Sequence, residues 1–171
     1  MARIRATPGI ELGRILHEYS PTETNALTEQ WLAAFAPNGF GQGSRQYLWH
    51  VFSFGATPAL EGAQALAHYE RKGCARYVVL ANDRQRKKAF LTDSRPVRST
   101  LEDWFVFPPN LAWTMAFTHE DGWIGPFFAL HPEHARLDAD NRAELGREQA
   151  RSRSEELKQR EIEKARRRGW I

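Results

Sequence analysis

The chain has 171 residues, of which 42% are hydrophobic and 12% aromatic, a composition that fits one globular domain and excludes a disordered chain. Its single cysteine, Cys74, excludes an internal disulfide framework and a zinc site made of cysteines. No apolar run of about 18 residues is present, and the N-terminal residues lack the pattern of a secretory signal. We therefore expect a cytoplasmic protein that makes no use of a membrane.

Charge is unevenly distributed along the chain. The 24 basic and 21 acidic residues give a net charge of +3. Between Arg136 and Arg168 there are eleven basic and eight acidic residues, so this segment holds the whole surplus and the remainder is balanced. A balanced body does not follow a nucleic-acid backbone, and we do not expect nucleic acid as a partner.

The first predicted helix covers residues 21–36. Ser20 can cap this helix, Pro21 suits its first position, and Glu23 completes a capping box. Four apolar side chains recur at helical spacing and predict the buried stripe of the helix: Leu27, Trp31, Ala34 and Phe35.

An apolar run with the sequence YLWHVFSF follows at 47–54. It predicts a central strand, because both of its alternating faces carry bulky side chains. Thr57 then predicts the cap of a second helix over 58–72. The inward positions of this helix are Leu60, Ala63, Leu66 and Ala67.

Two further strands are predicted at 76–81 and 88–92. The polar loop between them indicates a hairpin with an exposed basic tip. This tip consists of Arg84, Arg86, Lys87 and Lys88.

The most aromatic stretch of the chain is 104–130. Asp121-Gly122 predicts a two-residue turn between strands 112–119 and 123–130, in a register that pairs Met115 with Phe128. The core face of this hairpin is Trp113, Met115, Phe117, Ile124, Pro126, Phe128 and Leu130. The opposite face is smaller and lies under a helix or lines a groove. Pro126 predicts that the second strand is a sheet edge, because proline cannot donate to a further strand.

From Asp138 onward the chain is rich in charged helix formers and predicts a long, solvated helix. Glu156 and Arg160, and likewise Glu163 and Arg167, stand four residues apart in the favourable order. The apolar residues are too sparse for a coiled coil. We expect this helix to fold by itself and to contact the body or a protein partner.

These elements predict an α+β fold with a single antiparallel or mixed sheet, two packing helices and a long charged C-terminal helix. A short strand at 104–107 completes the sheet. The expected organisation is a globular α+β domain at 1–135 and a charged helical extension at 136–171. The expected core is Leu27, Trp31, Phe35, Leu48, Phe52, Leu66, Val78, Leu80, Trp113, Met115, Phe117 and Phe128.

Two histidines are candidates for catalysis. A small hydrolase-like enzyme would use His50 or His119 as a general base and Glu120 or Asp121 to orient it. The alternative is structural, with His50 as a buried core histidine and residues 118–120 shaping the turn. No HExxH or similar spacing is present, and we expect neither a metal nor a cofactor.

The segments YLWHVFSF at 47–54 and WTMAFTHEDGWIGPFF at 113–128 resemble a family of small bacterial proteins known only as a domain of unknown function. The resemblance covers roughly residues 22–130 and implies no activity. Members of that family are similar in size and single-domain build to immunity proteins, which bind and block a toxin made by the same bacterium.

The function that we expect is therefore non-enzymatic binding of a protein partner, with a cognate toxin as one such partner. Exposed aromatic residues beside a sheet edge are typical of such contacts. The predicted binding residues are Trp123, Phe127, Glu120 and Asp121. The hydrolase-like reading with His50, His119 and Glu120 is the alternative.

Overall fold

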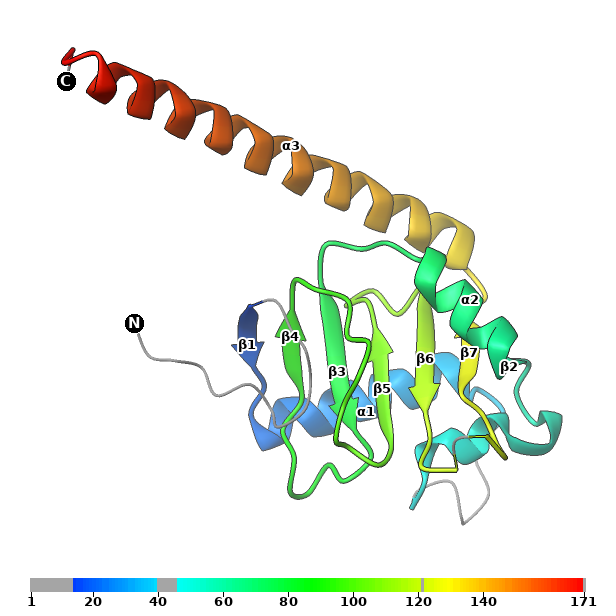
Figure 1. Cartoon of the computed structure of the whole chain (residues 1–171). Coiled ribbons are helices and arrows are strands. Elements are labelled where there is room, and N and C mark those ends of the chain that lie inside the picture. Colours follow the sequence, from blue (N-terminus) through cyan, green and yellow to red (C-terminus); the bar gives the residue numbers. More distant parts are fainter. Residues whose placement is uncertain (1–13, 40–45, 121, 171) are drawn as a thin grey trace.

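The computed structural model describes residues 14–39, 46–120 and 122–170, with the side chain of Phe54 excepted. It confirms the predicted α+β class (Figure 1). Seven strands form one antiparallel sheet in the order β1-β4-β3-β5-β6-β7-β2. They are β1 (Ile15–Glu18), β2 (Leu60–Glu61), β3 (Tyr77–Ala81), β4 (Phe90–Thr92), β5 (Trp104–Phe107), β6 (Trp113–Phe117) and β7 (Phe127–Leu130).

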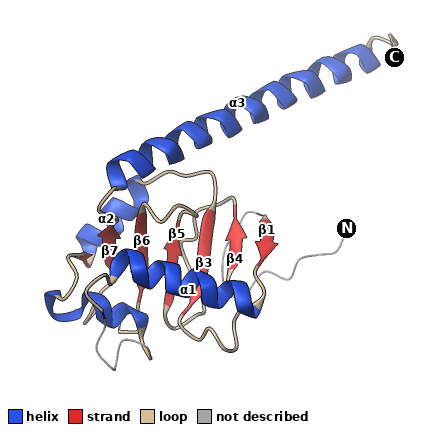
Figure 2. Ribbon diagram, turned by 180° about the vertical axis from the view of Figure 1, so that it is seen from behind, coloured by secondary structure: helices blue, strands red, loops and turns tan. Residues whose placement is uncertain are grey.

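Helix α1 (Pro21–Phe35) crosses one face of the sheet, as Figure 2 shows. Its predicted capping box is present: Ser20 Oγ accepts from the Glu23 N–H at 3.2 Å, and Glu23 Oε2 accepts from the Ser20 N–H at 2.7 Å. Trp31 is fully buried, and its Nε1–H donates to Thr114 Oγ1 on β6 at 2.9 Å. The smaller face of the predicted hairpin therefore lies under a helix.

Helix α2 (Ala63–Arg71) covers the other face near β6 and β7. Its predicted start at residue 58 is wrong, because Leu60–Glu61 pairs with β7 as strand β2 and Gly62 turns the chain at φ 62°. The buried positions of α2 are Ala65 and Tyr69, whereas Leu66 is 40% exposed. The predicted inward face, and Leu66 as a core residue, are therefore wrong.

The run at 47–54 is a 3-10 helix, η2 (Leu48–Gly55), and the predicted central strand is wrong. A short apolar run looks the same in a buried strand and in a buried helical turn, so its periodicity could not decide. In a 3-10 helix residues three apart share one side. Accordingly, the buried side chains are Leu48, Trp49, Val51 and Phe52.

The predicted strands at 76–81, 88–92 and 104–107 are confirmed as β3, β4 and β5. Both sheet faces are covered, so the core has two layers. One layer includes Trp31, Leu48, Phe105 and Phe127. The other includes Tyr69, Val106, Trp113 and Met115. Of the remaining predicted core residues, Leu27 and Phe117 pack against these layers but are only partly buried.

The predicted register between β6 and β7 is confirmed, since Trp113 pairs with Leu130 and Met115 with Phe128. Both strands are shorter than predicted, and residues 118–126 connect them without ladder pairing. The predicted sheet edge is wrong in one respect: β7 also pairs with the two-residue β2. The Gly62 N–H donates to the Pro126 carbonyl at 2.9 Å, so the contact between the two segments continues one residue past the last β2–β7 pair, Glu61 with Phe127.

Helix α3 (His134–Arg167) is the predicted long charged helix, and it starts four residues earlier than expected. Its first turns touch the body: Asn110 Nδ2 donates to the Leu137 carbonyl at 3.0 Å, and Lys72 pairs with the buried Asp138. Further along, the helix projects away from the sheet (Figure 1). Within the described residues, no helix has both the length and the hydropathy that crossing a membrane requires.

Candidate functional site

The candidate site lies where three neighbouring strands terminate, at the end of the sheet opposite to α3 (Figure 1). Because β3, β5 and β6 are antiparallel neighbours, the last residue of β3, the first residue of β5 and the last residue of β6 lie at this end. Trp104 pairs with Phe117, so Asp103 and Thr118 come directly after the last pair. The register therefore brings Asp103 next to His119, although the two are 16 residues apart in the chain.

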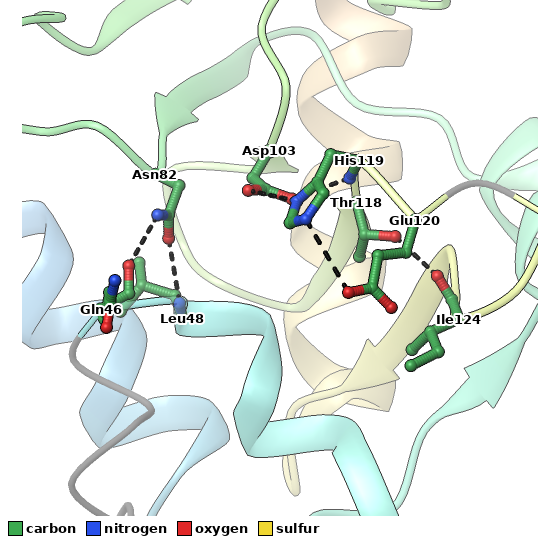
Figure 3. A network of polar contacts seen from close by, with 8 residues as sticks. All are labelled: Gln46, Leu48, Asn82, Asp103, Thr118, His119, Glu120 and Ile124. Carbon is green, nitrogen blue, oxygen red and sulfur yellow. Dashed lines mark hydrogen bonds and ion pairs between the residues drawn. The ribbon is translucent and has the colours of Figure 1, made fainter.

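Asp103 holds His119 by both its backbone and its ring (Figure 3). Asp103 Oδ1 accepts from the His119 N–H at 2.9 Å, and His119 Nδ1 lies 2.9 and 3.0 Å from the two carboxylate oxygens. The carboxylate side chain is only 4% exposed, whereas the imidazole is 37% exposed. A buried acid thus orients a ring that is itself partly exposed.

The pKa of His119 is raised above its ordinary value. The hydrogen bond to Asp103 is the largest cause, partial burial opposes it, and the charges of Asp103, Glu120 and Glu102 add to the rise. His119 Nε2 lies 3.8 Å from Glu120 Oε1. The imidazolium form is therefore favoured by carboxylates on both sides of the ring.

The structure brings His50 into the same neighbourhood as His119. Both rings contact Tyr47 and Trp49: the centroid of Tyr47 lies 5.5 Å from that of His50 and 5.7 Å from that of His119, and Trp49 lies 4.3 and 6.2 Å from the same two rings. Tyr47 and Trp49, the aromatic cluster, thus lie beside both predicted histidines, and Glu120 lies next to His119. The acid that orients His119, however, is Asp103, which the sequence did not indicate.

Asn82 fixes the aromatic cluster to the end of β3. Its Oδ1 accepts from the Leu48 N–H at 3.0 Å and its Nδ2 donates to the Gln46 carbonyl at 2.7 Å (Figure 3). Its backbone N–H donates to the Asp103 carbonyl at 2.9 Å. The partly buried Asn82 therefore joins η2, β3 and the segment before β5, and no sequence motif signals this role.

The predicted binding residues have different positions. Trp123 is 92% exposed, on the connection between β6 and β7. Phe127 is 3% exposed and packs against Trp49 and Phe52. The prediction that Phe127 is available to a partner is therefore wrong, because η2 and α1 cover that face of β7. Asp121 lies outside the described residues.

Among the residues that the structure describes, no three metal-ligating side chains gather in one place. What the site offers chemically is an oriented and partly exposed histidine, a second histidine nearby, and carboxylates on two sides. This arrangement can exchange a proton with a bound molecule.

Comparison with known proteins assigns the chain to a family. The model of the family described as "Domain of unknown function (DUF4275)" matches residues 35–128. No curated protein and no solved structure matches the chain. The matched segment contains the aromatic cluster, Asp103, His119 and Trp123, and it ends before α3. The predicted resemblance to a domain of unknown function agrees with this match, and the chain belongs to the DUF4275 family.

Proposed function

We propose that this protein is a non-enzymatic binding protein of the cytoplasm, and that it docks a protein partner at the turn carrying Trp123. The observation that carries the proposal is the 92% exposure of this indole within the family-matched segment. A large aromatic side chain left in water is a usual anchor for a partner, because its burial releases much apolar surface with few bonds to immobilise.

The turn around Trp123 is held in place before any partner arrives. Glu120 O accepts from the N–H groups of Trp123 at 2.9 Å and Ile124 at 3.0 Å. Thr118 Oγ1 donates to the Ile124 carbonyl at 2.6 Å, and the Gly125 N–H donates to Glu61 Oε1 at 2.9 Å. Because these bonds already hold the backbone of 123–125, a partner loses less affinity to ordering of these residues.

Charge supports a partner with a basic contact surface. Glu120 begins the turn, and Glu61 lies against its far end. A Lys or Arg of the partner would meet these carboxylates and can also stack on the exposed indole. We propose a toxin as the class of partner, and the small size and single-domain build that the family shares with immunity proteins support this choice.

The test compares two exposed tryptophans. Trp123→Ala removes the proposed anchor, and Trp170→Ala removes an indole that is 71% exposed beyond the end of α3. A partner captured with the full-length protein should be lost with Trp123→Ala and kept with Trp170→Ala. With the purified pair, Trp123→Ala should raise the Kd by about 30-fold or more, the effect of losing an anchor residue.

Two results would overturn this proposal. One is a partner that binds the Trp123→Ala protein as tightly as the wild type. The other is recovery of the protein alone from its native host, with no toxin gene beside its own.

A second candidate function is a small hydrolase-like enzyme, and the Asp103–His119 pair favours it. Here the neutral form of His119, which is populated above its raised pKa, would accept a proton at Nε2 from the attacking water while Asp103 orients the ring. His119→Ala and Asp103→Asn should then both abolish turnover of ester or amide probes, while His134→Ala should not. A protein that keeps its biological effect with His119→Ala would end this candidate.

A further inference from the structure

A cavity of about 630 Å³ lies beside the Asp103–His119 pair. Its walls are the loop 82–87 after β3 and the segment 100–103 before β5, and Tyr47 completes the lining. The volume falls within the range of roughly 300–1,000 Å³ that small-molecule sites occupy. Trp123, where we propose that the protein partner docks, does not line this cavity.

The walls of the cavity are fixed relative to one another. Asn82, in the loop wall, donates its backbone N–H to the Asp103 carbonyl and its side-chain N–H to the Gln46 carbonyl. It therefore connects the loop wall to the segment 100–103 and to the residue before Tyr47. Within the loop, the Asp83 carbonyl accepts from the N–H groups of Arg86 at 3.3 Å and Lys87 at 2.9 Å. A ligand would therefore meet a preformed concave surface.

The loop wall carries a net positive charge, because Arg84, Arg86 and Lys87 outnumber its one carboxylate, Asp83. In the described part of the chain, neither Arg86 nor Lys87 forms an ion pair, whereas the next residue, Lys88, pairs with Glu18 at 3.0 Å. Two adjacent exposed cations in the lining of a cavity suit a phosphate group, which accepts charge-assisted hydrogen bonds from both.

Glu102, on the segment 100–103, and Tyr47 suit other groups of the same ligand than a phosphate. Asp103 is occupied by His119, so on this wall Glu102 is the carboxylate that can accept hydrogen bonds from ligand hydroxyl or amino groups, while Asp83 lies on the loop wall. Tyr47 is half-buried and gives the cavity an aromatic surface on which a planar ring can stack. A phosphate, a hydroxylated spacer and a planar ring are the three parts of a nucleotide.

We propose that this cavity binds a mononucleotide. Its phosphate contacts Arg86 and Lys87, its sugar hydroxyls or base amino group contact Glu102, and its base stacks on Tyr47. The site shares Asp103 with the histidine pair, so a bound nucleotide lies next to the group that orients His119.

The test measures binding of AMP, inorganic phosphate and adenosine to the full-length protein by calorimetry, with NMR shifts to locate the site. AMP should bind more tightly than either of its parts and should shift the amides of 82–87 and 100–103. The double variant Arg86→Gln/Lys87→Gln should weaken AMP binding by about tenfold for each lost charged contact. Lys88→Gln is the matched control and should leave the affinity within about twofold of the wild type.

Tyr47→Ala should weaken AMP and adenosine but not phosphate, and Tyr47→Phe should restore the affinity because it keeps the ring. Both loop side chains are exposed, so the double variant should melt like the wild type, and a thermal scan checks this. Lack of AMP binding at millimolar concentration would overturn the proposal. Phosphate that binds as tightly as AMP, or AMP affinity that is unchanged in the double variant, would overturn it equally.

Discussion

Asp103 accepts the backbone N–H of His119 at 2.9 Å and holds Nδ1 of the same residue at 2.9 Å. This pair makes stability depend on pH. The raised pKa of His119 means that the folded state binds its proton more tightly than the unfolded state does. The stabilisation is then fully present below the unfolded value, near 6.5, and is lost as pH rises through the raised folded value.

The first prediction concerns this pH dependence. The free energy of unfolding of the wild type should fall from about pH 6.5 upward relative to that of Asp103→Asn, in which the charge is absent but an oxygen can still accept the backbone N–H. Urea melts at a series of pH values measure the difference. His134→Gln serves as a control for loss of a histidine and should keep the wild-type profile. A difference that grows as pH rises would have the wrong sign for this account.

The second prediction compares a buried with an exposed tryptophan of the same hairpin region. Trp113 has no exposed surface and contacts the rings of Tyr69 and Phe128, so Trp113→Ala should lower the free energy of unfolding by about 3–5 kcal/mol. Trp123→Ala should change it by no more than about 0.5 kcal/mol. Urea melts of the two variants test this, and equal effects would contradict the observed hairpin packing.

Local sequence signals predicted the elements whose determinants are local. The capping box of α1 depends only on Ser20 and Glu23, and the register of β6 with β7 follows from alternation around a short turn. The alternation at 47–54 predicts a strand, but the observed conformation depends on Asn82, whose side chain accepts from the Leu48 N–H 34 residues away. The burial of Phe127 has no local signal either, because the side chains that cover it, Trp49 and Phe52, lie in η2, about 75 residues earlier in the chain.

The candidate site could be predicted only in part for the same reason. His119 and Glu120 stand out because they adjoin a turn, but Asp103 reaches His119 only through the pairing of β5 with β6. The connection between these strands is no simple turn, and Leu111 within it adopts a positive φ of 58°. Such a conformation in a leucine has no sequence signal, so the register of β5 against β6 could not be worked out beforehand.

The third prediction concerns truncation of α3. Residues 154–164 are all exposed, so deleting 154–171 should leave the free energy of unfolding within about 0.5 kcal/mol of the wild type. Deleting 140–171 also removes the bond from Asn141 Nδ2 to Asn110 Oδ1 and the contact of Leu145 with Gly73. The cooperative melt should persist, with a loss of about 1–3 kcal/mol. A shorter protein without a cooperative melt would show that α3 supplies core.

The last prediction concerns Asn82, whose side chain connects η2 to the end of β3. Asn82→Ala removes the acceptor of the Leu48 N–H and the donor to the Gln46 carbonyl. Leu48 is fully buried, so its N–H would lose its partner at the start of a buried turn, and the free energy of unfolding should fall by about 1–3 kcal/mol. Asn82→Asp keeps the acceptor and should recover roughly half of the loss.

Because Tyr47 lies between the two bonded residues, Asn82→Ala should also shift the NMR signals of the Tyr47 and His50 rings. Asn110→Ala is the matched control, since Asn110 contacts α3 at the other end of the sheet, and it should leave those ring signals in place. Ring signals that respond equally to both substitutions would mean that Asn82 has no special role in placing the aromatic cluster.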